Sequence, residues 1–463
     1  MEEIGNEYLG RNVKRQICAA LIANTVLVAH GSISGWLSPA LDVLLSDDTP
    51  LIDGEISNEE LSWLGSISSL GSIVGTFIFS ILSSLLGCKR AMIFLALPSI
   101  VFWLLVFYGE YLLHLLIARF IMGMTAGGIQ SGIIIYVAEI SNDNIRGRLG
   151  SITPLARNVG VLIASIVGAT VDYGVIPAIL IYIPIVYIIS LYFLPNTPLF
   201  HLSRDDVKEA EKSLMFYKGY EGKSECEQLA LQLEFERLKN IVKATKANEK
   251  LHLKDFCSQT AVRGLIIGAA MAWFLQLTGC FIIINYAMLV FKNANTTMDP
   301  HISSIVLAIV QIFGGILSTS LSDTIGRKVL LVLSLLGSAF GLISLSAYLY
   351  LNHIGFNLSN YSALPVACLA FVILTACAGI APLSNVCAVE NLPPKIRTHG
   401  MVLYTLWYNI VNFFADKYFP ILLKGIHLHG CLMIFAVNCF LGTLFVVFYM
   451  KETKGRSLEI SEK

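Results

Sequence analysis

The sequence predicts an all-α membrane protein with twelve transmembrane helices in two six-helix halves. Over 463 residues, 55% are hydrophobic, 14% are charged and the mean hydropathy is +0.70. Most of such a chain cannot be solvated by water. Apolar runs long enough to cross about 30 Å of hydrocarbon recur along it. The polar motifs between these runs occur twice, at separations of roughly 240 to 250 residues. Together these observations predict a duplicated bundle of spans.

The spans are expected to be helices, because no alternating ten-residue strand pattern with turn residues occurs. The first apolar run lacks a small-residue cleavage site, so we expect it to remain as a span. We place the spans near residues 16–38, 61–86, 91–108, 112–138, 149–171, 176–194, 262–291, 302–322, 329–351, 363–389, 399–423 and 428–450. The predicted divisions are a cytoplasmic tail (1–15), an N-terminal bundle (16–194), a cytoplasmic linker (195–260), a C-terminal bundle (261–450) and a cytoplasmic tail (451–463).

Orientation follows from the basic residues, since cytoplasmic segments are rich in Lys and Arg. With the N-terminus inside, the cytoplasmic segments hold 27 of the 32 basic residues, whereas the first outer loop is acidic. Both termini are therefore expected in the cytoplasm. Three glycosylation sequons fall in loops that this topology places outside, at Asn295, Asn357 and Asn360. They predict a glycoprotein, and we expect it at the plasma membrane.

The linker contains DDVKEAEKSLMFYKG and SECEQLALQLEFERLKNIVKATKANEK, in which charges and apolar positions recur at helical spacing. We expect two to four short cytoplasmic helices there. A passive, solvated connection is favoured over an active role.

Composition excludes several other classes of protein. The formal net charge is zero and no basic block occurs, so nucleic acid is not an expected partner. The ten cysteines are scattered singly, without CxxC or Cys/His spacing, which argues against a disulfide framework or zinc site. No nucleophile–base pair, phosphate loop or metal cluster indicates an enzyme or a cofactor. The expected partners are the lipid bilayer and a small solute.

The two halves share a charged motif. YVAEISNDNIRGRLGS follows the fourth span and CAVENLPPKIRTHGMV follows the tenth, and in each a Glu precedes an Arg by seven residues: Glu139/Arg146 and Glu390/Arg397. A second pair of similar segments consists of LLGCKRAM, which follows the second span, and DTIGRKVLL, which follows the eighth. Duplicated halves are typical of transporters that rock about a midplane site. Each Glu can pair with the Arg of its motif, or with the GRK arginine of its half, in a latch that breaks when the cytoplasmic side opens. A static surface ion pair is the alternative, and the repetition favours the latch.

In order along the chain stand GWLSP, ARFIMGMTAGG, YVAEISNDNIRGRLGS, PNTPLF, SDTIGRK and KETKGRSLEI. Over nearly its whole length the chain resembles a sugar porter of the major facilitator superfamily, most closely the insect facilitated trehalose transporter-like group. The resemblance implies alternating-access movement of a sugar down its gradient. It also implies a set of gating and structural charges: Arg119, Glu139, Arg146, Asp323, Arg327, Glu390 and Arg397.

The resemblance also implies a substrate site, from which several family side chains are missing. The seventh-span Gln, Gln and Asn positions fall on Leu275, Gln276 and Phe281, and the fifth-span Gln position falls on Pro154. Apolar replacements leave substrate hydroxyls unpaired and make the cavity narrower, which weakens the case for trehalose or glucose. The alternative role for the retained polar groups is hydrogen bonding between helices. The implied lining is Gln276, Gln311, Asn412, Asn385, Phe281 and Tyr408.

Within WFLQLTGCFIIINYA, Gln276 and Asn285 are nine residues apart and therefore on opposite faces of a regular helix. Either Gly279 breaks the helix, or Asn285 binds a neighbouring helix. Asp416 and Lys417 either pair with each other or line a vestibule. The first span carries no acid, because the acidic position of proton-coupled relatives falls on Ile33. Uniport is therefore favoured over proton symport.

The leading hypothesis is a monomeric, facilitative carbohydrate uniporter. One alternative is transport of another small polyol or a less polar solute. A second is a non-transporting sensor, suggested by Ser84 and Cys88 in the eroded motif after the second span, although the short tail argues against it.

Overall fold

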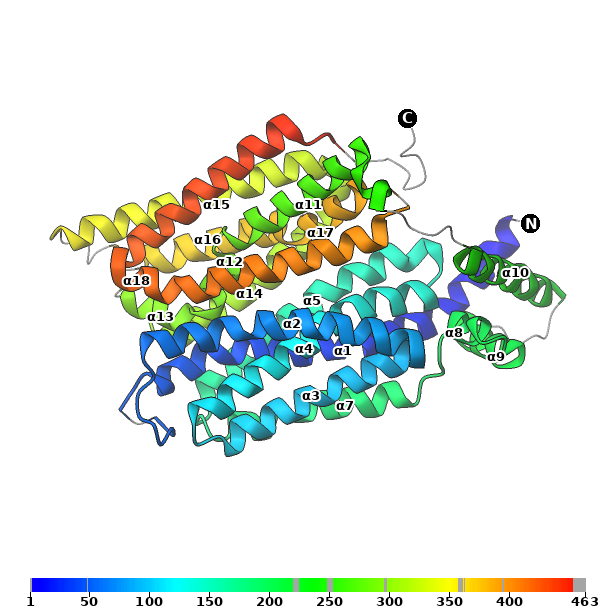
Figure 1. The fold of residues 1–463 in the computed structure, drawn as a ribbon, viewed down its shortest axis with the longest axis horizontal. Coiled ribbons are helices and arrows are strands. Elements are labelled where there is room, and N and C mark those ends of the chain that lie inside the picture. Colours follow the sequence, from blue (N-terminus) through cyan, green and yellow to red (C-terminus); the bar gives the residue numbers. More distant parts are fainter. Residues whose placement is uncertain are drawn as a thin grey trace.

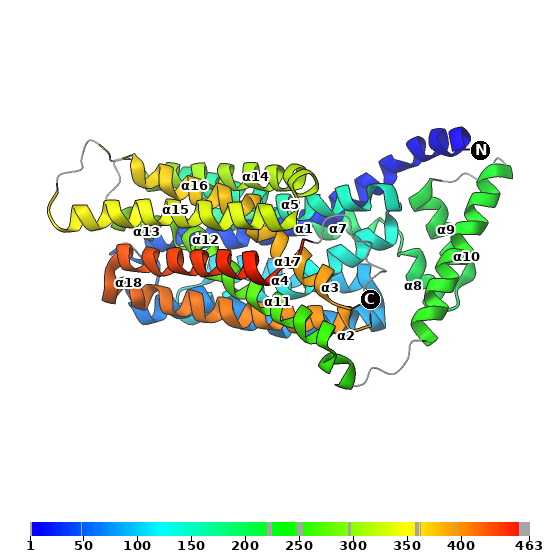
Figure 2. The ribbon, with the colours of Figure 1, turned by 90° about the horizontal axis from the view of Figure 1, so that it is seen from above.

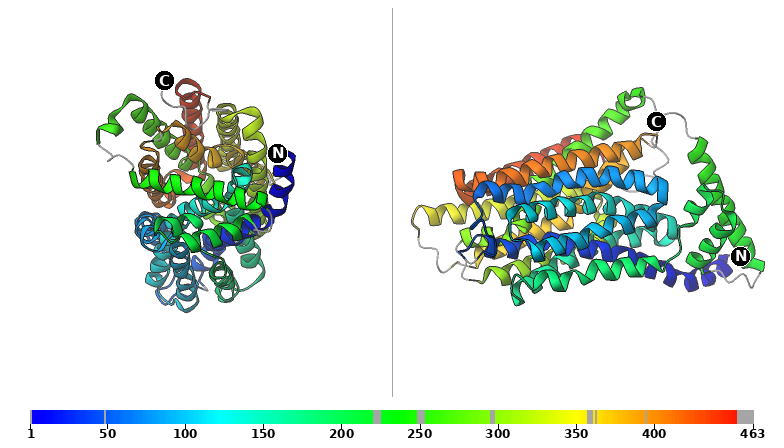
Figure 3. Two further views of the ribbon diagram at one scale, coloured as in Figure 1. Left: turned by 90° about the vertical axis from the view of Figure 1, so that its right-hand side faces the viewer. Right: turned by 60° about the horizontal axis from the view of Figure 1, so that its bottom comes forward.

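The computed structural model describes residues 2–47, 49–219, 225–247, 253–294, 298–356, 361, 363–393 and 395–452. Every regular element in these ranges is a helix. The long helices run along one axis, and the short linker helices gather at one end beside the N-terminus (Figures 1 and 2). Viewed end-on, the earlier spans form one group and the later spans another (Figure 3). The predicted all-α fold is confirmed.

The N-terminal half contains six crossings. They are formed by α1 (Glu2–Leu44), α2 (Asn58–Leu86), α3 (Cys88–Tyr108), α4 (Leu112–Ile140), α5 (Asp143–Thr170) and the consecutive pair α6 (Ile176–Leu180) and α7 (Tyr182–Tyr192). The first helix is longer than the predicted span of 16–38. It runs back through the polar stretch 2–15, which holds no proline to end it.

The C-terminal half contains the other six crossings. They are formed by α11 (Gln259–Gln276), α12 (Cys280–Asn285) and α13 (Ala287–Asn293), then α14 (Pro300–Ile325), α15 (Arg327–His353), α16 (Leu364–Ala378) with α17 (Ile380–Asn391), and α18 (Arg397–Tyr449). The last of these holds two crossings, because its backbone turns at His427 (φ 58°, ψ 173°). Ten helices are long and apolar enough to span a bilayer. With the shorter sixth crossing and the second arm of α18, the described chain accounts for twelve crossings.

Glycines let helices within the N-terminal half approach closely. A Cβ added at Gly31 of α1 would lie 2.0 Å from the Arg157 carbonyl oxygen of α5, and one at Gly71 of α2 would lie 2.0 Å from the Phe120 carbonyl oxygen of α4. Small residues at such crossings allow dense packing where lipid offers no hydrophobic drive. These glycines therefore allow α1 to pack closely against α5, and α2 against α4.

The linker docks onto the N-terminal half. It forms α8 (Pro198–Ser203), α9 (Val207–Lys218), α10 (Glu225–Ala247) and a 3₁₀ turn (Leu253–Cys257). The buried Tyr217 hydroxyl lies 2.9 Å from that of Tyr136 in α4 and donates to the Pro195 carbonyl at 2.6 Å. Lys218 pairs with Glu234 at 3.0 Å. These contacts hold α9 against the C-terminal end of α4.

Candidate functional site

The two halves are joined at the end opposite the linker helices. Lys292 of α13 forms an ion pair with Asp42 of α1, and His301 Nε2 lies 3.5 Å from the same carboxylate. Nearby, the Met288 backbone N–H donates to Ser38 Oγ at 3.2 Å. These contacts close the end of the bundle opposite the linker helices, between the first and seventh crossings.

A second junction links α2 and α18. Asn412 Nδ2 donates to Ser69 Oγ at 2.7 Å. The Lys417 ammonium lies 3.6 Å from the centroid of the Trp63 ring, and that ring lies 6.1 Å from the ring of Phe413. The two junctions together seal the outer half of the interface.

Two buried side chains of opposite charge lie in opposite halves behind this seal, without a direct ion pair between them. Arg119 of α4 is 1% exposed; its Nε donates to the Leu64 carbonyl at 3.0 Å and its Nη2 to the Gly65 carbonyl at 3.4 Å. Asp416 of α18, also 1% exposed, interacts electrostatically with Arg119 and accepts from Asn412 Nδ2 at 3.1 Å. Since Lys417 lies over Trp63, the neighbours Asp416 and Lys417 take different partners.

The seventh crossing is broken, and the break separates its polar groups. Gly279 takes a left-handed conformation (φ 75°) between α11 and α12, which confirms one of the two expected explanations. Gln276 is 1% exposed and lies beside Tyr408, and its Nε2 is buried without a hydrogen-bond partner. Asn285 lies beside Asp416. Gln276 therefore faces the eleventh crossing, and Asn285 lies next to the buried carboxyl group of Asp416.

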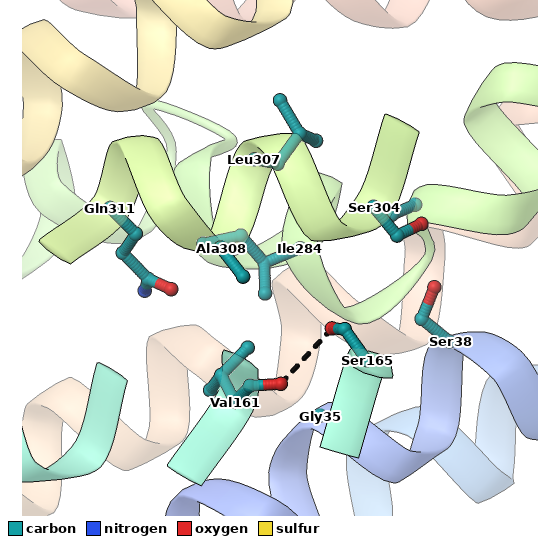
Figure 4. A pocket seen from close by; sticks show the side chains of 10 residues that line it. Gly35, Ser38, Val161, Ser165, Ile284, Ser304, Leu307, Ala308 and Gln311 are labelled. Atoms are coloured by element: carbon teal, nitrogen blue, oxygen red, sulfur yellow. Dashed lines mark hydrogen bonds between the residues drawn. The ribbon is translucent and has the colours of Figure 1, made fainter. Parts of the chain in front are cut away.

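Gln311 lines a small cavity of about 10 Å³ where α1, α5 and α14 meet. Figure 4 shows its side chain pointing toward α5, with Ser38, Ser165 and Ser304 around the same cavity. The Gln311 carbonyl accepts from Asn158 Nδ2 at 3.2 Å, while its side-chain oxygen is buried without a partner. A cavity of this size holds about one water molecule.

Of the other implied lining residues, Tyr408 and Phe281 both lie near Arg157. Tyr408 stacks with Tyr404 at 6.3 Å between centroids, and the Phe281 ring lies 5.1 Å from the guanidinium carbon of Arg157. Asn385 is half-buried on α17.

Arg157 is a site residue that the motifs did not single out. It lies near the middle of α5, and it interacts electrostatically with His30, Cys280 and Tyr408. A signal was present in the sequence: few basic residues lie outside the cytoplasmic segments, and a charge within a span is costly enough to indicate function.

The structure describes only some of the charged residues for which the resemblance implies a gating role. Arg327 Nε lies 3.4 Å from Glu390 Oε1, so this Glu pairs with the GRK arginine of its own half. Glu452 accepts from the backbone N–H groups of Arg327 and Lys328, each at 3.0 Å, and so caps the first turn of α15.

In the N-terminal half, Glu139 has a buried oxygen without a hydrogen bond and lies within reach of Thr197. Arg397 donates to the Leu392 carbonyl at 3.4 Å. The side chains of Arg146 and Asp323, and the sequons at Asn295, Asn357 and Asn360, lie outside the described residues.

Two compact six-helix halves, sealed on one side and joined by buried polar groups, define a multi-pass membrane transporter. Residues 20–463 match the family described as "Sugar (and other) transporter", and the chain belongs to this family. The resemblance seen in the motifs is thereby confirmed.

Curated relatives and solved structures agree with this assignment. The chain is 31% identical over 447 residues to the facilitated trehalose transporter Tret1 of Bombyx mori, covering 96% of this chain and 85% of the relative. It is 27% identical over 452 residues to Tret1 of Culex quinquefasciatus, covering 97% and 85%. The fold is similar to the inward-open conformation of the xylose transporter XylE from E. coli, at a TM-score of 0.78 and 19% identity over 96% of this chain and 98% of that one. The chain therefore has the major facilitator fold.

Proposed function

We propose that this protein carries a sugar across the plasma membrane by facilitated, alternating-access transport, with both termini in the cytoplasm. The observation that carries the proposal is the outer seal between the two halves, with buried polar groups directly behind it. The family assignment supports the substrate class, and the Tret1 relatives are named for trehalose transport.

The binding step rests on the polar groups at the junction. Gln276, Gln311 and Asn412 come from three different crossings, and Tyr408 adds a hydroxyl beside Gln276. Amides offer both donors and acceptors to sugar hydroxyls. The buried, unpaired Gln276 Nε2 and Gln311 Oε1 atoms are the groups that a substrate would satisfy. Asn385 and Phe281 complete the proposed lining.

The conformational step exchanges contacts at the two ends. For the outer side to open, the contacts of Asp42 with Lys292 and of Asn412 with Ser69 must break. The cytoplasmic charges would then close the inner side. We assign this latch role to Glu139, Arg146, Asp323, Arg327, Glu390 and Arg397, and a structural role between the halves to Arg119.

The remaining expectations belong to the same proposal. The protein is proposed to act as a monomer in the bilayer, divided into the segments 1–15, 16–194, 195–260, 261–450 and 451–463. Glycosylation is proposed at Asn295, Asn357 and Asn360.

Uptake of radiolabelled trehalose and glucose in oocytes tests the function. We expect saturable uptake above water-injected controls. Gln276→Ala should reduce it about tenfold, because a lost hydrogen bond costs about 1 to 1.5 kcal/mol. Gln259→Ala, at the exposed start of the same helix, should leave uptake unchanged. With surface expression confirmed, no uptake of either sugar would exclude this function for them.

A second candidate is transport of a polyol or a less hydroxylated solute. It is favoured by the apolar side chains of Leu275 and Phe281 near the break in the seventh crossing. Thermal-shift screening distinguishes it, since stabilisation by hexoses alone would exclude it.

A further inference from the structure

An arginine reaches the junction of the two halves without a counter-charge. Arg157 lies near the middle of α5, and its guanidinium carbon is 5.1 Å from the centroid of Phe281 on α12, in the opposite half. Its electrostatic neighbours are His30 on α1, Cys280 on α12 and Tyr408 on α18. The cation therefore lies among the groups proposed to line the substrate site.

One guanidinium donor of Arg157 is buried and unsatisfied. Its Nε is buried and has no hydrogen-bond partner, and in the described part of the chain no carboxylate lies within 4 Å of the guanidinium. Arg119 is a contrast within the same protein, because it donates to two backbone carbonyls and has Asp416 as its counter-charge. A charge within a span is costly, and where its partly buried head group has no protein partner, a ligand can supply one.

A second buried polar group, on His30, lies beside Arg157. His30 Nδ1 is buried without a hydrogen-bond partner, and His30 interacts electrostatically with Arg157. The acidic groups of this region do not compensate the pair: Asp416 interacts with Arg119, and Asp42 pairs with Lys292 at the outer end. The centre of the site therefore carries net positive charge.

The form of Arg157 specifies the anion. A guanidinium presents a planar fork that binds a carboxylate through two parallel hydrogen bonds, and stacking on an aromatic ring holds that plane. One cation compensates one negative charge, which matches a carboxylate better than a phosphate dianion. Gln276 and Tyr408 remain available for hydroxyls.

We propose that the substrate is a monoanionic sugar acid, of the hexuronate or aldonate class, whose carboxylate binds Arg157. The proposal rests on the transport function proposed above and narrows its substrate class. It also gives a reason for the loss of hydroxyl-binding side chains at Leu275 and Phe281. A ligand anchored by a charge-assisted pair needs fewer neutral hydrogen bonds.

The test compares D-glucuronate with D-glucose, by uptake in oocytes and by thermal stabilisation of the purified protein. For the wild type we expect glucuronate to be taken up faster than glucose and to raise the melting temperature more. Arg157→Gln should lower glucuronate uptake about tenfold or more and abolish its stabilising effect, while glucose uptake persists. Arg157→Lys, which keeps the charge without the fork, should retain part of the activity. The control, Arg148→Gln, alters an exposed arginine on the same helix and should behave as wild type.

The Arg157→Gln variant is expected to fold, because removing a partly buried cation that has no protein partner does not lower stability. Its melting temperature should equal or exceed that of the wild type. Glucuronate uptake that is unchanged in Arg157→Gln would overturn the proposal. The proposal would also be overturned if the wild type transported glucose but was neither stabilised by glucuronate nor able to transport it. That outcome would leave the proposed sugar transport function standing. Failure to transport either compound, with surface expression confirmed, would remove both proposals.

Discussion

Replacing Asp416 by Asn tests whether the charge pair behind the outer seal holds the halves together. The substitution preserves volume and removes the counter-charge of Arg119, leaving that guanidinium 1% exposed with only backbone carbonyls and Met122 Sδ as partners. Since the two side chains interact without a direct ion pair, the cost should lie below the about 3 to 5 kcal/mol of breaking a direct buried pair, at about 2 to 3 kcal/mol. At roughly 2 °C per kcal/mol for a large chain, the melting temperature should fall by roughly 4 to 6 °C.

A double-mutant cycle separates the pair from its surroundings. Thermal unfolding is measured for Asp416→Asn, Arg119→Met and the double variant. Either single change leaves the other charged group buried without its partner. The double variant should therefore be no less stable than the less stable of the two single variants, which gives an interaction free energy of about 2 kcal/mol or more. Lys417→Gln is the neighbouring control, and its loss of a cation–π contact should cost about 1 kcal/mol. Additive single effects, or an unchanged melting temperature for Asp416→Asn, would refute the reasoning.

Three further changes test other contacts. Gly279→Ala places a side chain on a left-handed backbone (φ 75°), with its Cβ 2.4 Å from the ring of Phe435. In thermal melts it should lower the unfolding free energy by about 2 to 5 kcal/mol. An unaltered melting curve would argue against the helix break being required. Glu452→Ala removes the cap of α15 and should lower the unfolding free energy by about 1 kcal/mol. Glu452→Asp is not expected to restore it, because the shorter side chain cannot reach both N–H groups. Asp42→Asn removes a partly exposed ion pair with Lys292, so its effect should stay below about 1 kcal/mol and vanish at high salt; a larger loss would show that this contact dominates the seal.

Much of the architecture could be predicted from the sequence, because a bilayer imposes length and hydropathy on each crossing. Helix ends and breaks were less predictable. The first helix extends to Glu2, beyond the apolar span. The apolar residues end at the membrane boundary, but that boundary does not by itself end a helix. The turn at His427 uses a left-handed residue that is not glycine, and residue type does not indicate such a position.

The site was predictable only where residues act along one helix. Gln276 and the break at Gly279 followed from a single segment. The partners of Arg119 lie on α2 and α18, and Arg157 meets Phe281 more than a hundred residues along the chain. Such pairs depend on how the halves dock, which hydrophobic periodicity does not encode.

The cap that Glu452 places on α15 has a consequence for biosynthesis. In the first half, the equivalent corner is completed soon after the sixth crossing: Phe200 packs against Gly87, and Arg204 donates to the Leu85 carbonyl. In the second half, the backbone N–H groups of Arg327 and Lys328 are capped by the Glu452 carboxylate, which lies more than a hundred residues downstream. During translation the first bundle can therefore finish its cytoplasmic corner before the seventh crossing leaves the ribosome. The second bundle cannot do so until residue 452 has been synthesised, and its maturation is correspondingly late.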